Sequence, residues 1–233
     1  MKLLISPRSL DEAQKVIAGG ADIVDIKNPA EGSLGAGSPR LIKAVKKLTG
    51  DKTEVSAALG DISVWMPGTI GLAAYGAMQA GANYVKMGAL KINEQQAIDT
   101  AKACVSALNG SCSMVIAAYA DASRVNGLSP LKIPQIATST NSHVAMIDTA
   151  IKDGRGLLKN MKTYTLRKFI KESHGYGLKV ALAGEVKLAE IELLKSLETD
   201  IIGLRSAVCE NGQRNASINE ARIRELVEFC KKI

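Results

Sequence analysis

Aromatic residues and histidines are scarce in this chain of 233 residues. Aromatic side chains make up only 3% of the sequence, so surfaces on which unpaired bases could stack are few, and we expect no nucleic-acid partner. His143 and His174 are the only histidines, which argues against a histidine metal cluster and against a Ser-His-Asp relay. Acid and base chemistry is therefore expected to fall to lysine and carboxylate side chains.

Paired cysteines and long apolar runs are also missing. The four cysteines form neither a CxxC pair nor a spacing typical of zinc sites, and they lie in apolar segments, which favours reduced thiols in a cytoplasmic protein. The apolar run at the start of the chain is too short for a signal peptide, and no run approaches the roughly 18 apolar residues that span a membrane. We expect a soluble cytoplasmic protein without a membrane partner.

The sequence does contain a regular alternation of two kinds of segment. Apolar runs typical of buried parallel strands, such as residues 180–183, alternate with segments of helical period, and several recur about every 30 residues, as βα units do. With 46% hydrophobic residues and no long linker, residues 1–233 are expected to form a single α/β domain, a (β/α)8 TIM barrel. An open doubly wound sheet is the alternative, but no GxGxxG follows the first strand. The eight expected strands span residues 2–5, 22–27, 53–57, 83–86, 113–118, 143–148, 179–183 and 200–204.

Polar residues mark the starts of several helices. Capping boxes are predicted at Ser9, Asn93 and Ser217, each of which is followed three residues later by an acid or an amide. Ser38 with Pro39 predicts a further helix start. These positions place a helix after the first, second, fourth and eighth expected strands.

Lys27 ends the second expected strand and precedes a glycine-rich loop. Because side chains alternate along a strand, Asp25 and Lys27 point to one face and Ile26 to the other. A lysine with an ordinary pKa near ~10.4 is almost entirely charged at pH 7, whereas only the neutral amine attacks a carbonyl. Burial and a cationic neighbour would favour the neutral amine, and a solvated ion pair at the end of a surface strand is the alternative. The loop at residues 28–37 is expected to act as a closing lid or to be an ordinary mobile connection.

Three ionisable side chains end alternate strands. Lys27, Lys86 and Asp148 close the second, fourth and sixth expected strands, and alternate strands of a barrel contribute to the same interior layer. Because barrel active sites lie at the carboxyl ends of the strands, we expect these groups to meet there. Lys86 would lower the pKa of Lys27 and exchange protons, or else contact a phosphate or stay exposed. Lys152 follows Asp148 by four residues and would suit a one-turn ion pair if the segment is helical, whether or not the pair is catalytic.

A phosphate site is expected beyond the last two strands. Gly184 follows the seventh strand, and Gly203, Arg205 and Ser206 surround the end of the eighth. Many barrels bind phosphate at this place through backbone N–H groups and a basic residue. The alternative is that the glycines only make tight turns. The net charge of +7 also favours an anionic partner.

One segment of the sequence is similar to the signature loop of a known family. Residues 25–36, DIKNPAEGSLGA, resemble the loop of the (5-formylfuran-3-yl)methyl phosphate synthases of methanofuran biosynthesis, and the resemblance continues through shorter motifs to residues 203–205. That family is a TIM-barrel lyase group that joins two molecules of glyceraldehyde 3-phosphate into a phosphorylated furan aldehyde, with loss of one phosphate and water. The resemblance implies the same reaction here, with no metal and no organic cofactor. It also implies site roles: Schiff-base formation for Lys27, proton transfer for Lys86, and support from Asp25, Asp148 and Lys152.

The expected mechanism begins with condensation of Lys27 with a triose-phosphate carbonyl. The protonated imine assists deprotonation of the neighbouring carbon, and the resulting enamine attacks the aldehyde of a second triose phosphate. A class I aldolase or transaldolase-like enzyme would use the same lysine but release a linear sugar phosphate. A non-catalytic phosphate-ligand sensor would bind without forming an adduct. A homo-oligomer is also expected, because barrels with apolar outer helices commonly associate.

Overall fold

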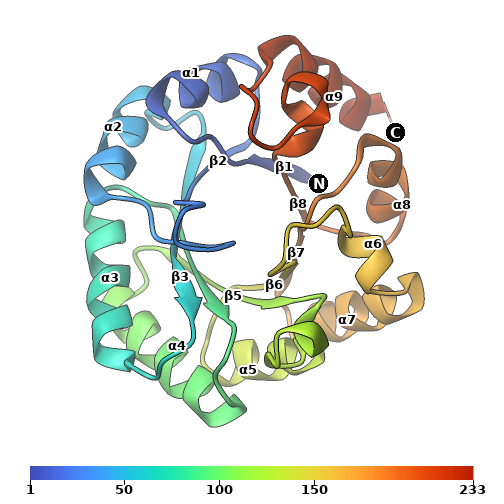
Figure 1. Cartoon of the computed structure of the whole chain (residues 1–233). Helices are drawn as coiled ribbons and strands as arrows, with labels where there is room; N and C mark the ends of the chain where they lie inside the picture. The colour runs from blue at the N-terminus through green and yellow to red at the C-terminus, as the bar shows by residue number, and fades with distance from the viewer. Residues whose placement is uncertain (233) are drawn as a thin grey trace.

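The computed structural model describes residues 1–232, and its eight strands form one closed barrel. Each strand runs parallel to its neighbours in chain order, and the barrel closes where β1 (Lys2–Ile5) pairs with β8 (Ile201–Leu204). Figure 1 looks down the barrel, with the strands around the centre and the helices outside them. The (β/α)8 barrel expected from the sequence is therefore confirmed. The other strands are β2 (Ile23–Ile26), β3 (Glu54–Ile62), β4 (Tyr84–Ala89), β5 (Ser113–Tyr119), β6 (Val144–Asp148) and β7 (Lys179–Leu182).

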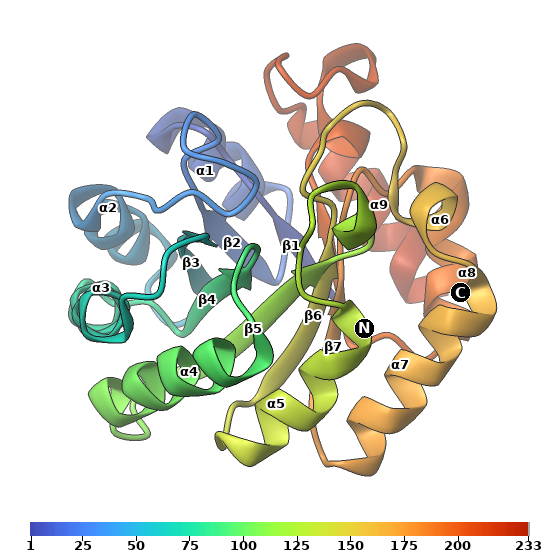
Figure 2. The ribbon, with the colours of Figure 1, turned by 60° about the horizontal axis from the view of Figure 1, so that its bottom comes forward.

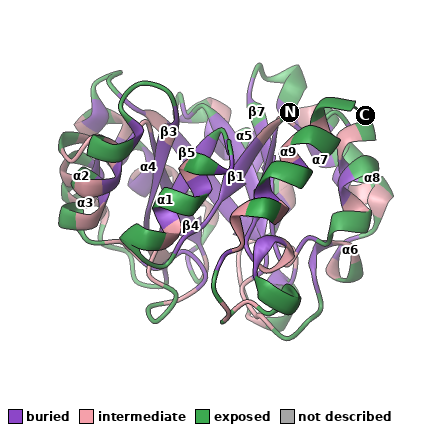
Figure 3. Cartoon of the chain, turned by 90° about the horizontal axis from the view of Figure 1, so that it is seen from above, coloured by how far each residue is buried: buried purple, intermediate pink, exposed green. Residues whose placement is uncertain are grey.

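The helices cover the outside of the barrel (Figure 2). Burial is concentrated in the strands and on the inward faces of the helices, while the outward helix faces are exposed (Figure 3). None of the helices within residues 1–232 is long and apolar enough to cross a membrane. The helices are α1 (Leu10–Ala18), α2 (Pro39–Thr49), α3 (Pro67–Gln79), α4 (Glu94–Leu108), α5 (Ile133–Ser139), α6 (Leu157–Asn160), α7 (Thr163–Gly175), α8 (Ile191–Ser196) and α9 (Glu220–Lys232).

Apolar side chains fill both faces of the sheet. One cluster, which includes Val24 and Val85, lies between the strands and the helices, and a smaller one that includes Ile23 and Val115 fills the barrel interior. Fully burying a side chain of this kind contributes about 1.5–3 kcal/mol, whereas a buried polar group is costly unless it has a partner. Polar residues inside the barrel are therefore the positions where a functional explanation is needed.

Strand β3 is longer than the sequence predicted. The expected strand covered residues 53–57, whereas β3 runs from Glu54 to Ile62 with a shift in its register against β4 between Ala58 and Asp61. Gly60 has a φ of +123° at this irregularity, a value that glycine adopts without strain. The extension carries Asp61 to the carboxyl-terminal end of the barrel.

Three of the four predicted helix caps are confirmed. The side chains of Ser9 and Ser38 each accept an N–H from the first turn of the following helix, and Asn93 forms a complete capping box. The box predicted at Ser9 is incomplete, because Glu12 accepts the N–H of Arg8 instead of that of Ser9. The prediction at Ser217 was wrong. Helix α9 begins two residues later than that box requires, and the side chain of Asn219 accepts the N–H of Arg222 at 3.2 Å.

Candidate active site

Four ionisable side chains from β2, β4 and β6, and from the residue after β2, come together in the barrel. Asp25 lies in β2, Lys27 follows that strand directly, Lys86 lies in β4, and Asp148 ends β6. Asp25, Lys86 and Asp148 are each no more than 1% exposed, which charged groups rarely are unless they are paired. The structure thus brings these residues to one end of the barrel, as their order in the sequence suggested.

Lys86 and Asp25 form a buried ion pair. Nζ of Lys86 lies 2.5 Å from Oδ1 of Asp25, and the hydroxyl of Ser6 donates to Oδ2 at 2.9 Å. Burial by itself would raise the pKa of Asp25, but the charges of Lys86 and Lys27 and the two hydrogen bonds outweigh it and hold that pKa below its ordinary value. Asp25 is therefore an anion that neutralises Lys86.

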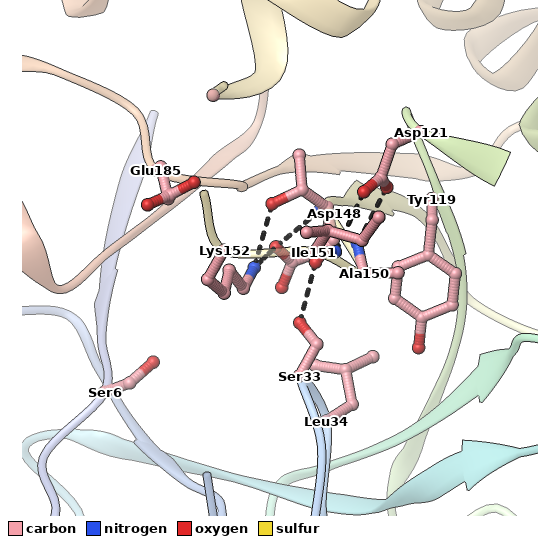
Figure 4. A network of polar contacts seen from close by, with 12 residues as sticks. Ser6, Ser33, Leu34, Tyr119, Asp121, Asp148, Ala150, Ile151, Lys152 and Glu185 are labelled. Atoms are coloured by element: carbon pink, nitrogen blue, oxygen red, sulfur yellow. Dashed lines mark hydrogen bonds and ion pairs between the residues drawn. The ribbon is translucent and has the colours of Figure 1, made fainter. Parts of the chain in front are cut away.

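Asp148 and Lys152 form the second ion pair of the site (Figure 4). Nζ of Lys152 lies 2.7 Å from Oδ1 of Asp148 and 3.0 Å from the hydroxyl of Thr149, whose N–H also donates to Asp148. Burial alone would raise the pKa of Asp148, but Lys152, Lys27 and these hydrogen bonds lower it well below its ordinary value. Residues 149–156 are not helical, so the pair forms across an irregular loop instead of one helical turn.

Asp121 gives this loop its shape. Its buried carboxylate accepts the N–H groups of Ala150 at 2.7 Å and Ile151 at 2.8 Å (Figure 4). Satisfying two successive N–H groups fixes the turn through which Lys152 returns to Asp148. Asp121 was not predicted from the sequence, and it lies two residues after the end of β5.

The pKa of Lys27 is lowered to about 8 from the ordinary value of 10.5. Burial of the amine is the largest cause, and Lys86 and Lys152 lower the pKa further, while Asp148 and Asp25 raise it. The side chain keeps partial contact with solvent, so an incoming molecule can reach it. A pKa of about 8 leaves roughly a tenth of the molecules with a neutral amine at pH 7. Lys86 lowers the pKa of Lys27, as expected from the sequence.

A narrow cleft that opens to solvent adjoins Lys27. Its walls come from β1, β2, β6 and β8 and from the loops after β1, β2, β6, β7 and β8. Asp25 and Asp148 line it beside Lys27, and Lys152 lines it from the loop after β6.

The four residues of the predicted phosphate site line the same cleft: Gly184, Gly203, Arg205 and Ser206. Gly184 has a φ of +106°, and a Cβ atom there would lie 2.8 Å from Cγ2 of Thr149, so a larger residue would be both strained and crowded. Among residues 1–232, no backbone carbonyl accepts the N–H of Gly184 or Ser206. These two N–H groups are available to an anion.

Arg205 directs its guanidinium into the protein. Nε donates to the carbonyl of Arg214 at 2.9 Å, and Nη1 donates to the carbonyl of Ser6 at 2.7 Å. Nη1 and Nη2 also reach the carboxylate of Glu12 at 2.9 and 3.3 Å, and Nη2 reaches the carbonyl of Ala216 at 3.4 Å. Because a guanidinium carries five N–H groups, these contacts occupy its donors. Arg205 lines the cleft as predicted, but its guanidinium binds protein acceptors and supports the cleft wall instead of facing a phosphate.

The loop after Lys27 is folded into the mouth of the barrel (Figure 1). Lys27 and Ala36 form an antiparallel bridge, and Leu34 is fully buried in the interior cluster. The hydroxyl of Ser33 donates to the carbonyl of Thr149 at 2.9 Å, which joins this loop to the loop after β6 (Figure 4). The loop is an ordered cover in this structure, and the lid motion expected from its glycines stays a prediction.

Asp61 and Tyr119 hold the same loop, and neither was predicted from the sequence. The carboxylate of Asp61 accepts the N–H of Leu34 at 3.2 Å and the hydroxyl of Tyr119. Burial, reinforced by the charge of Asp61, raises the pKa of Tyr119 well above its usual value. A Cβ atom at Gly88 would overlap the Tyr119 hydroxyl, so only glycine leaves room for this contact. The available signal was an acid at the end of the third apolar run.

The remaining metal-binding residue types are dispersed. No group of three or more histidine, cysteine, aspartate or glutamate side chains in the described part of the chain is arranged to hold a metal ion. All four cysteines are free, and burial raises the pKa of Cys104 and of Cys112 to about 12, so these two thiols stay protonated.

Comparison with known proteins identifies the family. Residues 3–227 match the sequence profile described as 4-HFC-P synthase. The chain belongs to this family. The (5-formylfuran-3-yl)methyl phosphate synthase of Methanocaldococcus jannaschii is 47% identical over 236 aligned positions, which cover 99% of this chain and 100% of that protein. The protein of the same name from Methanococcus maripaludis strain C5 is 45% identical over 237 positions that cover both chains completely.

The resemblance seen in the sequence is thus confirmed, and membership of the 4-HFC-P synthase family indicates an enzyme. Among solved structures, phosphoribosyl anthranilate isomerase from Thermus thermophilus has a TM-score of 0.66 at 15% identity and covers 100% of this chain and 99% of its own. A 3-hexulose-6-phosphate synthase has a TM-score of 0.64 at 18% identity, covering 97% and 99%. At these identities the likeness shows the barrel fold alone.

Proposed function

We propose that this member of the 4-HFC-P synthase family is a Schiff-base lyase that joins two molecules of glyceraldehyde 3-phosphate into (5-formylfuran-3-yl)methyl phosphate, in methanofuran biosynthesis. The names of relatives at 41–47% identity support the product. The observation that carries the chemistry is the lowered pKa, about 8, of the Lys27 amine beside a cleft. A lysine nucleophile of this kind needs no metal or organic cofactor.

The first step is attack by the neutral amine of Lys27 on the carbonyl of a triose phosphate. The carbinolamine then loses its oxygen as water and becomes a protonated imine. Asp148 remains an anion at neutral pH because its pKa is lowered, so it stabilises the positive charge of the imine.

The protonated imine withdraws electrons, which allows a proton to leave the neighbouring carbon. The Lys86–Asp25 pair takes up this proton: once the Lys86 ammonium has passed a proton to the carboxylate 2.5 Å away, its neutral amine accepts the proton from carbon. The enamine then attacks the carbonyl carbon of the second triose phosphate. Phosphate elimination, ring closure and dehydration complete the furan, and hydrolysis of the imine releases the product and restores the Lys27 amine. The atoms of two substrates equal those of one product, one inorganic phosphate and two water molecules, so no oxidant or reductant is needed.

The phosphate groups orient the two substrates in the cleft. The free N–H groups of Gly184 and Ser206 donate to phosphate oxygens, and Gly203 leaves the space that they require. A Cβ atom at Gly203 would lie only 2.9 Å from that of Ala183. Arg205 takes part by holding the wall of the cleft.

Borohydride trapping tests the covalent step. Incubation with glyceraldehyde 3-phosphate and borohydride should add a stable mass to the peptide that contains Lys27, and Lys27→Ala should abolish the adduct. Lys171→Ala, which removes an exposed lysine of α7, is the matched control and should keep it. An adduct that persists in Lys27→Ala, or no adduct in the parent chain, refutes the proposal.

Product analysis separates the alternatives. A furan aldehyde absorbs in the ultraviolet, and its formation releases inorganic phosphate. A class I aldolase or transaldolase-like enzyme would form the Lys27 adduct but show neither signal. A phosphate-ligand sensor would bind the triose phosphate without an adduct.

A further inference from the structure

We infer that Arg214 binds a phosphate group of the substrate, and that Glu12 and Arg205 position Arg214 for this contact. The inference rests on the proposed function, since it names the residue that recognises the phosphate of that substrate. Arg214 lines the cleft that holds Lys27, Gly184 and Ser206.

The other cations of the cleft are already engaged. Lys152 is paired with Asp148, and the donors of Arg205 are occupied by protein acceptors. Lys27 supplies the reacting amine. No carboxylate or carbonyl within residues 1–232 forms a hydrogen bond or ion pair with the guanidinium of Arg214, although this side chain is only partly exposed. A guanidinium presents paired N–H groups that match two phosphate oxygens.

The backbone that carries Arg214 is held at three successive carbonyls. The carbonyl of Arg214 accepts Nε of Arg205 at 2.9 Å, and that of Ala216 accepts Nη2 of Arg205 at 3.4 Å. Between them, the carbonyl of Asn215 accepts Nη1 of Arg8 at 3.1 Å. A loop anchored at three consecutive residues presents its side chain from a fixed position.

Glu12 connects the two arginines that make these contacts. Its carboxylate pairs with Arg205 at 2.9 Å and also accepts the backbone N–H of Arg8 at 2.7 Å. The side chains of Arg205 and Glu12 are 6% and 13% exposed, so water competes little for the pair. Glu12 lies in the first turn of α1, which is beside α9 in Figure 1. The start of α1 thereby fixes the segment at residues 214–216.

Arg214 also lines a neighbouring groove with Lys187 and Arg222, so it stands in the wall between that groove and the cleft. A phosphate bound there would lie at the end of the cleft that carries Ser206. The carbonyl end of the same substrate would then extend toward Lys27.

Kinetics with and without the phosphate group test the inference. Arg214→Ala should raise KM for glyceraldehyde 3-phosphate by about 10-fold to 100-fold, as expected for the loss of a charge-assisted contact, and should weaken inhibition by inorganic phosphate similarly. Borohydride trapping of unphosphorylated glyceraldehyde at Lys27 should not change. Arg214→Lys should restore part of the affinity. Arg155→Ala, which removes an exposed arginine outside the cleft, is the control and should change none of these values.

Glu12→Gln tests the positioning role. It should raise KM for the phosphorylated substrate and leave kcat and the trapping of unphosphorylated glyceraldehyde unchanged. An equal loss with both substrates would show a merely structural role and overturn the positioning claim. An unchanged KM and unchanged phosphate inhibition in Arg214→Ala would overturn the assignment of Arg214. If the parent chain forms no adduct at all, the proposed function fails, while calorimetry with inorganic phosphate still decides whether Arg214 binds it.

Discussion

Lys86 and Asp25 are joined across an intervening strand, because β3 lies between β2 and β4 in the barrel. The pair is sealed from water, with side chains that are 1% and 0% exposed. If either partner is removed, water cannot solvate the charge that remains. The pair is therefore both a proton-transfer element of the proposed mechanism and a constraint on stability.

Removing one partner of this pair should destabilise the fold. Lys86→Met leaves the Asp25 carboxylate buried without its cation, which should lower the free energy of unfolding by about 3–5 kcal/mol. The double variant Lys86→Met with Asp25→Asn should recover most of this loss, because no buried charge remains unpaired. Urea unfolding measures both. If the single variant is as stable as the double variant, the burial argument is wrong.

The rate of imine formation should follow the protonation of Lys27. Because the pKa of Lys27 is about 8, the rate of borohydride trapping should rise about tenfold per pH unit below pH 8 and level off above it. An ordinary lysine would continue to gain rate up to about pH 10.5. The folded chain also binds fewer protons than the unfolded chain between these two values, so this group makes stability rise with pH there.

Two substitutions should shift the midpoint of this pH profile, the pH at which the trapping rate is half its maximum, in opposite directions. Asp148→Asn removes an anion that raises the pKa of Lys27, so the midpoint should fall. Lys152→Met removes a cation that lowers it, so the midpoint should rise. Trapping rates of the three proteins across pH 6 to 11 give the comparison. Shifts of the same sign in both variants would contradict the charge assignment.

Gly88→Ala should disturb the cover of the barrel mouth. The added Cβ atom would overlap the Tyr119 hydroxyl and lie 2.8 Å from Oδ1 of Asp61, so overpacking should cost about 1–3 kcal/mol. Amide exchange at Leu34, whose N–H is held by Asp61, should become faster. Gly76→Ala in α3 meets nothing within 4 Å and is the matched control. Equal effects of the two substitutions would refute the steric argument.

The homo-oligomer expected from the sequence stays a prediction, and α3 is the face on which to test it. This helix has no charged residue, and Leu72 and Tyr75 on it are 75% and 49% exposed. Apolar surface of this kind commonly packs against a second copy of the same chain. Leu72→Glu with Tyr75→Glu should reduce the mass found by light scattering to that of one chain. Tyr164→Glu, at a 78% exposed residue of α7, should not, and an unchanged mass in the double variant would exclude this face.

The positions of the reacting groups were predictable because they depend on local rules. Lys27 and Asp148 stand at the ends of apolar runs, and a parallel barrel places such ends on one rim. Lys86 was expected to end its strand, but β4 continues to Ala89, so Lys86 lies inside that strand, as Asp25 does inside β2. The start of a helix could be predicted where a side chain caps that same helix, as at Asn93.

Features that depend on distant partners were not predictable in the same way. The capping box expected at Ser217 fails because Ile218 is held extended in a bridge with Cys209, so the helix starts later. The contacts of Arg205 involve Ser6 and Glu12, which are almost 200 positions away in sequence and come near only when the barrel closes. Asp61 was not predicted because β3 continues past Gly60, whereas the expected strand ended at residue 57.

The burial of both lysine–aspartate pairs has a consequence for the response to salt. Mobile ions screen charges that face solvent over roughly 10 Å at 0.1 M, but they scarcely reach charges enclosed by protein. Raising the ionic strength should therefore weaken capture of an anionic substrate at the open end of the cleft while leaving the acidity of the amine almost unchanged. Adding sodium chloride should thus weaken substrate binding without changing the covalent step at the amine.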